Sequence, residues 1–271
     1  MSVSRWCGAA AAAALGCAWS WGAERAPDPV SYVLPLMGTD SSFKLSSGNV
    51  YPAIARPWGM NVWTPQTGKM GDGWAYTYAA NKLVGIKQTH QPSPWINDYG
   101  QFAVMPLTGK RAFAQDDRAS WFSHKAERAA PHLYSVYLAD FDTTVEVTPT
   151  ERAAMFRVTY PKTEQAWFVV DAFDKGSSIK VLPEQRKIVG WTTRNSGGVP
   201  ANFKNYFVLV FDQPFASASV WRDKELKEGV LELQDNHVGA LVQFAAPARG
   251  TRVHVRVASS FISPEQAEIN L

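Results

Sequence analysis

Alternation of apolar and polar residues is the pattern that most constrains the fold of this chain. In segment 252–257 three valines alternate with Arg, His and Arg, and in segment 145–147 two valines flank a glutamate. A period of two residues is typical of a β-strand with one buried and one solvated face. The same pattern and short apolar runs predict further strands over 60–64, 74–78, 83–88, 101–105, 121–125, 133–138, 154–159, 166–172, 179–182, 186–193, 206–211, 216–221, 230–233 and 238–244.

Turn-forming residues separate these segments. Gly, Pro, Asn and Asp recur between the predicted strands at intervals of roughly 8–12 residues, which is the spacing of a large β-sandwich. Continuous apolar runs such as 207–211 (FVLVF) indicate strands that are buried on both faces. Such strands predict two large stacked sheets with some structure covering the outside. The sequence contains no linker, low-complexity segment or internal repeat, so we expect one all-β domain.

The first 22 residues have the features of a secretory signal. Arg5 gives a positive n-region, and the alanine-rich apolar run after it is too short for a comfortable membrane span. Cleavage is expected after Ala18 or after Gly22, and lipidation of Cys17 is an alternative. Cys7 and Cys17 both lie in this segment. Cleavage therefore leaves a chain without a disulfide or a thiolate metal site, and we expect a secreted or periplasmic protein.

The charge balance and the missing motifs exclude several classes of function. The formal net charge is +3 and Lys and Arg form no basic stripe, so nucleic acid is not an expected partner. Sequence patterns of nucleophilic hydrolases, NTPases, metalloproteases and EF-hands do not occur. The five histidines lack the spacing of zinc ligands.

Segment 87–100 is the strongest candidate for a functional site. Pro92 and Pro94 fix the backbone angle φ and exclude helix on either side, so we expect an extended, stiff loop between two strands. The candidate binding side chains of this loop are His90, Trp95, Asn97 and Asp98. Loops on a rigid β-scaffold concentrate binding groups. A structural turn around a buried tryptophan is an equally good interpretation of these residue types.

Aromatic residues are frequent in the sequence within about forty positions around this loop. The aromatic residues concerned are Trp58, Trp63, Trp74, Tyr76, Tyr78, Trp95 and Tyr99. Aromatic faces beside Asp, Asn, Gln and His are typical of a sugar site, because the C–H face of a pyranose stacks on a ring while planar polar groups bond its hydroxyls. Core packing explains most individual aromatics of a sandwich. Trp95 is the exception, because its neighbours Pro94 and Asn97 place its backbone in a loop.

Asp98 and His90 are the titratable pair of the loop. An inverting glycosidase needs two carboxyl groups about 6.5–9.5 Å apart, a separation that a sequence does not reveal. For Asp98, capping or hydrogen bonding within the loop is the more frequent role of such a residue. A second polar cluster contains Asp40 and Asn49, whose short side chains near glycine suit either a pocket wall or Asx-turns.

The C-terminal residues predict a short helix. Ser263 takes the N-cap position, Pro264 the first helical position and Gln266 the third. Fewer than two turns follow before Leu271, so the helix depends on tertiary packing. It is interpreted as the beginning of a longer helical region or as a terminal helix docked on the sandwich.

Several short motifs follow one another in the first half of the chain. They are LMGTD (36–40), GNVYPA (48–53), PWGM (57–60), WTP (63–65), GWAY (73–76), GIKQTH (85–90) and NDYG (97–100). This succession, with segment 261–267 at the other end, resembles the N-terminal domain of glycoside hydrolase family 92, the calcium-dependent exo-acting α-mannosidases. The resemblance covers essentially all of the expected mature chain.

The resemblance implies a β-supersandwich, galactose mutarotase-like in fold, that packs on an (α/α)6 barrel with the active site at their interface. In such enzymes the general acid, the general base and most Ca²⁺ ligands come from the barrel, and the sandwich supplies pocket loops for the mannoside. By motif, the implied substrate-binding residues are His90, Trp95, Asn97 and Asp98, with Asp40, Asn49 and Trp74 as neighbours. The loop sequence THQPSPW departs from the commoner His-Leu-Ser-Gly type, so the linkage specificity is not carried over.

We therefore assign residues 1–22 to a signal peptide, 28–262 to the supersandwich and 263–271 to the start of a linker helix. No barrel follows Leu271, so we expect the sugar-recognising part of a secreted α-mannosidase that acts on α-mannosides such as N-glycan mannose. Its partner would be the barrel, in cis or in trans. Alone, the chain should bind sugar weakly, hold no catalytic carboxylate and few Ca²⁺ ligands, and expose an apolar barrel-facing patch. Alternatives are a stand-alone lectin-like module and, by fold analogy alone, an aldose-epimerase-like enzyme.

Overall fold

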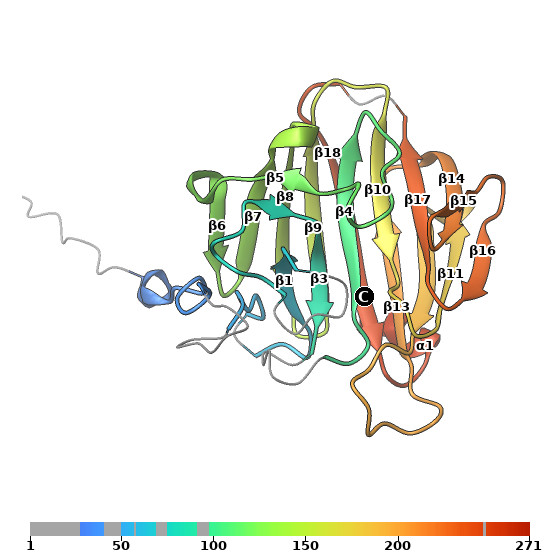
Figure 1. Ribbon diagram of the computed structural model, residues 1–271, viewed down its shortest axis with the longest axis horizontal. Helices are drawn as coiled ribbons and strands as arrows, with labels where there is room; N and C mark the ends of the chain where they lie inside the picture. Colours follow the sequence, from blue (N-terminus) through green and yellow to red (C-terminus); the bar gives the residue numbers. More distant parts are fainter. Residues whose placement is uncertain (1–27, 41–49, 57, 69–74, 91–97, 246–247) are drawn as a thin grey trace, which may run out of the picture.

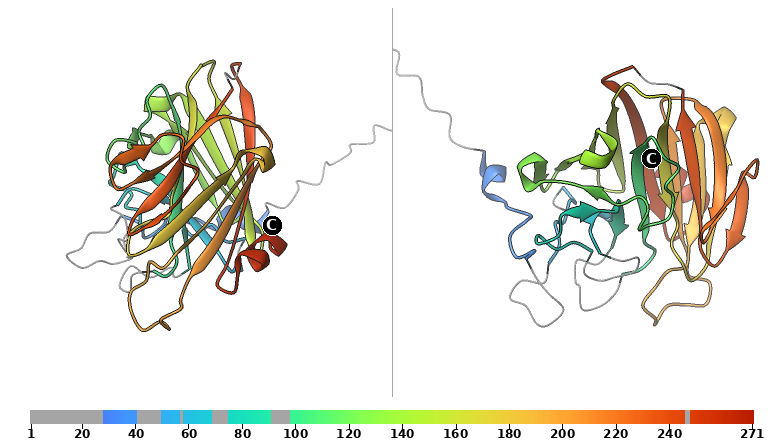
Figure 2. Two further views of the ribbon diagram at one scale, coloured as in Figure 1. Left: turned by 90° about the vertical axis from the view of Figure 1, so that its right-hand side faces the viewer. Right: turned by 45° about the horizontal axis from the view of Figure 1, so that its top comes forward.

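The computed structural model describes residues 28–40, 50–56, 58–68, 75–90, 98–245 and 248–271. In this part of the chain two large antiparallel sheets face each other, which confirms the expected all-β sandwich (Figure 1, Figure 2). The seven-stranded sheet has the order β1 (Val62–Gln66), β3 (Gly85–Thr89), β4 (Phe102–Thr108), β10 (Ala166–Asp171), β17 (Val238–Phe244), β14 (Phe215–Arg222) and β15 (Glu225–Lys227). The nine-stranded sheet has the order β16 (Glu232–Asp235), β11 (Ser177–Leu182), β12 (Lys187–Thr192), β13 (Asn205–Phe211), β18 (Thr251–Ser260), β9 (Ala153–Tyr160), β8 (Thr143–Pro149), β7 (Leu133–Leu138) and β6 (Glu127–Ala130).

Smaller elements complete the described part of the chain. A two-stranded ribbon pairs β2 (Lys82–Leu83) with β5 (Ser120–Trp121). Short 3-10 turns are η1 (Pro29–Tyr32), η2 (His124–Ala126), η3 (Ala139–Phe141) and η4 (Pro183–Gln185), and the α-helix is α1 (Pro264–Ile269).

The period-2 pattern of β18 is confirmed. Val253, Val255 and Val257 are buried in the sandwich, whereas Arg252 and Arg256 on the other face are exposed. β4 and β10 instead are buried almost throughout. Their outer face is covered in part by the segment before β5, because Arg118 reaches across it to the end of β10. The covered outer face thus explains the continuous apolar runs of the sequence.

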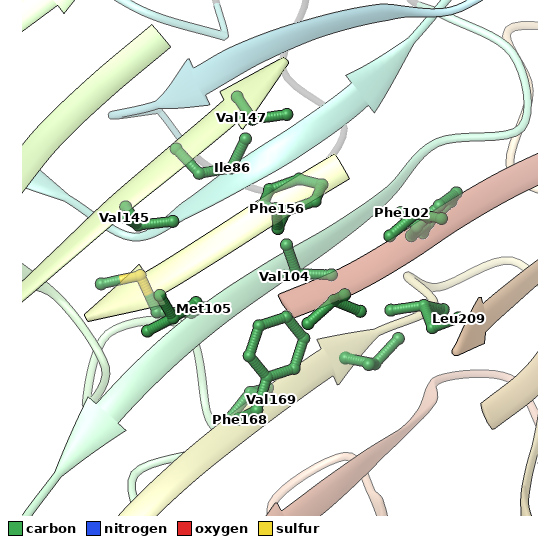
Figure 3. Packing of buried hydrophobic residues seen from close by; sticks show 14 of the residues in the cluster. Ile86, Phe102, Val104, Met105, Val145, Val147, Phe156, Phe168, Val169 and Leu209 are labelled. Atoms are coloured by element: carbon green, nitrogen blue, oxygen red, sulfur yellow. The ribbon is translucent and has the colours of Figure 1, made fainter. Parts of the chain in front are cut away.

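Aliphatic and aromatic side chains from both sheets fill the space between them (Figure 3). Phe156 of β9 meets Trp63 of β1 edge-on, with ring centroids 5.0 Å apart. Phe102 of β4 stacks on Phe207 of β13 at 4.5 Å. Burying one such phenylalanine stabilises the fold by about 1.5–3 kcal/mol relative to leaving it exposed. These contacts fix the two sheets against each other and so fix the loops at their ends.

The predicted C-terminal helix is present. The Oγ of Ser263 accepts a hydrogen bond from the backbone N–H of Gln266 at 3.1 Å, which is the expected N-cap contact. Ala267 is buried against Ala153, Val208 and Ala258. The helix therefore docks on the outer face of the nine-stranded sheet, and this packing supplies the stability that its length does not.

Several predicted strands were wrong in whole or in part, and the one over 60–64 begins only at Val62. The strand over 121–125 ends at Trp121, because the next residues form η2, in which Ser123 caps the N–H of Lys125. Residues 75–78 of the predicted strand 74–78 are not in a strand, and Trp74 lies outside the described residues. In 230–233 the strand begins only at Glu232.

Candidate functional site

The predicted loop lies at one end of the sandwich. β3 ends at Thr89 and β4 begins at Phe102, so His90 and residues 98–101 lie at this end. The connection between β12 and β13, residues 193–204, projects from the nine-stranded sheet at the same end (Figure 1). The turn between β18 and α1 contributes Phe261, whose ring contacts His90. We call this set of described residues the loop end.

Asp98 closes the loop on itself. Its two carboxylate oxygens each accept a hydrogen bond from the backbone N–H of His90 at 2.9 Å, and Oδ1 also accepts one from the N–H of Tyr99 at 2.7 Å. The side chain is buried. Short acidic side chains commonly stabilise loops by bonding nearby backbone N–H groups. These contacts give Asp98 the loop-holding role that its residue type favours.

His90 presents a hydrogen-bond acceptor that has no partner among the described residues. Its Nδ1 lies 2.7 Å from the carbonyl oxygen of Tyr99, so Nδ1 carries the proton and donates it. In the neutral ring, Nε2 is then an acceptor, and it is buried without a partner among the described residues. Burial lowers the pKa of His90, although the charge of Asp98 and the bond to Tyr99 oppose the change. The neutral ring is thus favoured, and a ligand hydroxyl would satisfy Nε2.

Gly100 joins the loop to the opposite sheet. Its N–H donates to the carbonyl oxygen of Arg194 at 2.6 Å, and its carbonyl oxygen accepts from Nδ2 of Asn205 at 2.6 Å. Gly100 has a φ of +65°, and a Cβ there would lie 2.4 Å from the Cβ of Asn205. Both the backbone conformation and the close approach require glycine.

Amide side chains line the base of the loop end. Nδ2 of Asn205 also donates to Oε1 of Gln88 at 3.1 Å, and Nζ of Lys87 donates to Oε1 of Gln101 at 3.1 Å. Nε2 of Gln88, Nε2 of Gln101 and Oδ1 of Asn205 are buried without a partner among the described residues. A buried polar atom without a partner costs about 1–3 kcal/mol, so water or a ligand is expected to bind such atoms.

Aromatic rings form the outer part of the loop end. Phe261 is 41% exposed, and the centroid of its ring lies 4.7 Å from that of His90. Phe203 packs between Phe261, at 5.5 Å, and Tyr99, at 6.3 Å. An exposed ring beside unpaired polar atoms suits the apolar face of a sugar, and it also suits a protein interface.

The structure brings together only some of the predicted site residues. His90 and Asp98 share the loop. Asp40 is exposed, and the carbonyl oxygen of the preceding Thr39 accepts from the N–H of Tyr78, outside the loop end. The predicted residues Asn49, Trp74, Trp95 and Asn97 lie outside the described residues. Sugar binding by these residues stays a prediction.

Sequence reasoning did not identify Asn205 or Phe261 as site residues. Asn205 is 105 positions from Gly100, and its polar side chain before an apolar strand looks like that of any turn residue. Phe261 belongs to a segment of the resemblance, but its place beside His90 depends on the turn after β18. Both contacts arise because the two sheets pack face to face, and no local sequence pattern predicts that packing.

A second buried cluster, the Glu127 cluster, lies around β6 and β7. Oε1 of Glu127 accepts from the hydroxyl of Tyr134 at 2.7 Å, and Oε2 accepts from the hydroxyl of Tyr76 at 3.0 Å and from Nδ1 of His124 at 2.6 Å. Nε2 of His124 donates to the carbonyl oxygen of Tyr78 at 2.7 Å. Both ring nitrogens of His124 thus face oxygen acceptors. Burial and the charge of Glu127 raise the pKa of Tyr76 and Tyr134.

A third cluster, the Asp171 cluster, lies on the outer face of the seven-stranded sheet. Oδ2 of Asp171 accepts from Nη2 of Arg118 at 2.8 Å, and Oδ1 accepts from Nε2 of His237 at 2.8 Å and from the N–H of Phe173 at 3.0 Å. Burial alone would raise the pKa of Asp171, but Arg118 and His237 lower it. Burial would likewise lower the pKa of His237, but Asp171 raises it.

The described residues do not fit a metal site. Among them no group of three or more His, Cys, Asp or Glu side chains is placed to hold an ion. The Asp98 carboxylate, the acidic group of the loop, already accepts three backbone hydrogen bonds. The calcium that the sequence resemblance implies therefore has no set of ligands in this part of the chain. None of the helices in the described ranges is long and apolar enough to cross a membrane.

Comparison with known proteins places the loop end in context. The chain matches the family model of the glycosyl hydrolase family 92 N-terminal domain over residues 32–260. It is 46% identical to an inverting mannosidase of family GH92 from Bacteroides thetaiotaomicron VPI-5482, with a TM-score of 0.86 over 89% of this chain and 32% of that chain. A family GH92 α-mannosidase from Bacteroides thetaiotaomicron, solved in complex with mannoimidazole, is 27% identical, with a TM-score of 0.78 over 89% of this chain and 33% of that one. The chain thus spans about a third of these relatives. No curated protein matches it.

Proposed function

The chain belongs to glycosyl hydrolase family 92, whose N-terminal domain it contains, and we propose that it is the sugar-recognising part of an α-mannosidase. The main support is Nε2 of His90, which is buried at the loop end beside Phe261 and has no partner in the described part of the chain. A mannoside hydroxyl would donate to Nε2 while a C–H face of the sugar packs against the ring. A relative solved with the sugar analogue mannoimidazole supports the choice of ligand.

In this proposal the loop end binds and orients the sugar, and proton transfer belongs to groups elsewhere in the enzyme. Asp98 and Gly100 hold the loop backbone through the contacts described above. Trp95 and Asn97, in the same loop, are proposed to complete the pocket. The general acid, the general base and the Ca²⁺ ligands would come from an (α/α)6 barrel, in cis or in trans. The substrates would be α-mannosides such as those of N-glycans.

An exposed apolar surface supports a barrel partner. Trp58 is 88% exposed, Ile262 is 77% exposed and Ile269 is 76% exposed. Ile269 lines one hollow together with Arg56 and residues 150–152, so Arg56, two positions before Trp58, lies beside the end of α1. Exposed apolar side chains of this size are typical of an interface. We propose that the barrel covers this surface.

Export of the protein is also proposed. The N-terminal segment has the n-region and apolar run of a signal, and a mannosidase of external glycans would have to leave the cytoplasm. Expression with the full N-terminus in a Gram-negative host, followed by fractionation and N-terminal sequencing, tests this. A mature protein that starts after Ala18 or Gly22 supports cleavage, a lipid-modified Cys17 supports anchoring, and uncleaved protein in the cytoplasm contradicts export.

Calorimetry with mannoimidazole tests sugar recognition. We expect weak but saturable binding to the purified chain, and loss of that binding in His90→Phe, which keeps a ring against Phe261 but removes the Nε2 acceptor together with the Nδ1 donor to Tyr99. His132→Phe, at an exposed histidine between β6 and β7, is the matched control and should bind like wild type. Absence of binding by folded wild-type protein would contradict the proposed role.

A second experiment tests whether this chain only binds the sugar while the barrel supplies catalysis. It measures hydrolysis of an aryl α-mannoside and of α-1,2-linked mannobiose with excess Ca²⁺. We expect no release of mannose by the chain alone. Calcium-dependent release that Asp98→Ala abolishes would show that this part of the enzyme holds a sufficient site. Interconversion of mannose anomers, followed by NMR, would instead favour an epimerase. Sugar binding by a monomer that does not associate would favour a lectin-like module.

A further inference from the structure

Asn205 joins the two sheets directly beneath the loop end. It is the first residue of β13 in the nine-stranded sheet, and its side chain is fully buried. From there, Nδ2 donates to Oε1 of Gln88 on β3 and to the carbonyl oxygen of Gly100 in the loop. One amide from the opposite sheet therefore holds both the strand that leads into the loop and the backbone that leads out of it.

The orientation of this amide is determined by its partners. A backbone carbonyl only accepts hydrogen bonds, so Gly100 requires a donor and Asn205 must present Nδ2. Gln88 must then present Oε1 to the same Nδ2, which leaves its own Nε2 and the Oδ1 of Asn205 without partners among the described residues. A carboxylate or an apolar side chain at position 205 has no proton to give to Gly100.

The contact is short and the backbone there has little freedom. The carbonyl of Gly100 lies 2.6 Å from Nδ2, and its N–H is held by the carbonyl of Arg194. The guanidinium of Arg194 in turn forms an ion pair with Asp174, in the turn between β10 and β11. Both polar backbone groups of Gly100 are thus fixed by residues that follow β10 in the chain, far from the loop in sequence.

We propose that Asn205 is a positioning residue for the sugar-binding loop. From the opposite sheet it fixes the position of the backbone of residues 98–100. Asp98 and Tyr99 in turn fix the position of His90 through their hydrogen bonds. Asp98 bonds the N–H of His90, and the carbonyl of Tyr99 fixes the imidazole through Nδ1. The benefit for binding depends on the proposed sugar recognition, whereas the positioning of the loop backbone does not.

Two measurements on Asn205→Asp test this role. The substitution keeps the shape of the side chain but replaces the donor with an acceptor that faces the carbonyl of Gly100. We expect hydrogen exchange of the Tyr99 and Gly100 amides to become at least about tenfold faster, and mannoimidazole to bind at least about tenfold more weakly, a change of about 1.4 kcal/mol. Asn205→Ser, which keeps a smaller donor, should shift both in the same direction by less, and it replaces Asn205→Asp if the latter does not fold.

Thr143→Ala is the matched control. Thr143 is also fully buried, and its Oγ1 donates to the carbonyl of Phe141 at 2.8 Å, at the start of β8. This variant should lose global stability without a specific effect on residues 98–100 or on the sugar. If the Asn205 variants change exchange at Tyr99 and Gly100 no more than Thr143→Ala does, Asn205 is only a core residue and the inference is wrong. If wild type fails to bind mannoimidazole, the proposed function fails, and the exchange rates alone decide the role of Asn205.

Discussion

The loop end and the Glu127 cluster are built from similar groups but differ in how completely their hydrogen bonds are satisfied. Each contains a buried carboxylate that accepts a hydrogen bond from a histidine. Glu127 accepts from Nδ1 of His124, and Asp98 accepts from the backbone N–H of His90. In the Glu127 cluster both carboxylate oxygens and both nitrogens of His124 have protein partners. At the loop end, Nε2 of His90 and three amide atoms have none among the described residues. The difference separates a cluster that stabilises the fold from one that still has capacity to bind a ligand.

The Asp171 cluster belongs with the Glu127 cluster in this comparison. Nε, Nη1 and Nη2 of Arg118 donate to the carbonyls of Val84 and Phe113 and to Asp171. Both oxygens of Asp171 are likewise occupied. Substitutions in the two complete clusters should therefore lower the free energy of unfolding, and removal of the loop-end acceptor Nε2 of His90 should weaken sugar binding.

The largest effect is expected for Asp171→Asn. The change leaves the guanidinium of Arg118 buried, with only 1% of its side chain exposed, and without a counter-charge. Breaking a buried ion pair by removing one partner costs about 3–5 kcal/mol. Urea denaturation followed by tryptophan fluorescence measures the loss. Glu146→Gln is the control, because its ion pair with Arg157 is partly exposed and should be worth less than about 1 kcal/mol. Equal losses in the two variants would contradict a special role for the buried cluster.

A smaller loss is expected for Glu127→Gln. The amide keeps one acceptor but turns an NH₂ group toward the hydroxyls or toward His124, so at least one charge-assisted hydrogen bond is lost, worth about 1.5–3 kcal/mol. Urea denaturation and mannoimidazole calorimetry are run on the same preparation. Affinity for the sugar should stay as in wild type. A fall in affinity of the folded variant would mean that the Glu127 cluster and the loop end are not independent.

The two histidines should change stability with pH in opposite directions. The pKa of His90 is lowered by burial, so below about pH 6.5 the unfolded chain takes up a proton more readily and stability falls with falling pH. The pKa of His237 is raised by Asp171, so its contribution is complete below about pH 6.5 and is lost as the pH rises through the folded-state pKa.

Replacing each histidine by glutamine separates the two contributions. Urea denaturation at pH 5.5, 6.5 and 8.5 should show a flatter acid side for His90→Gln and a flatter alkaline side for His237→Gln. The charged groups that face His237 are Asp171, Arg118 and Asp174, and Asp116, Asp117, Asp223 and Lys224 line the hollow beside it. A flattened acid side in His237→Gln would reverse the assigned sign and contradict the assignment.

The sequence predicted the elements of this fold better than its contacts. The alternation in β18, the cap at Ser263 and the prolines after His90 are local signals, and they located a strand, a helix and the candidate loop. The partners of Asp171 lie 53 and 66 positions away along the chain, and Gly100 lies 105 positions from Asn205. The order of strands across two sheets sets such pairs, and one sequence does not encode that order in any local pattern. The resemblance to family 92 pointed to the loop, but not to the residue of the opposite sheet that holds it.

The smallest effect is expected for Tyr99→Phe, and it bears on which atoms of the loop end matter. The hydroxyl of Tyr99 donates to the carbonyl of Gly197 over 3.3 Å in an exposed position, a bond worth at most about 0.5 kcal/mol. The ring contact with Phe203 and the backbone bonds to His90 and Asp98 are kept. Unfolding free energy and mannoimidazole affinity should both stay close to wild type, whereas His90→Phe should lose the affinity and, with the Nδ1 bond to Tyr99, some stability. A large loss of affinity in Tyr99→Phe would move the binding surface from Nε2 of His90 to the hydroxyl of Tyr99 and to the connection between β12 and β13.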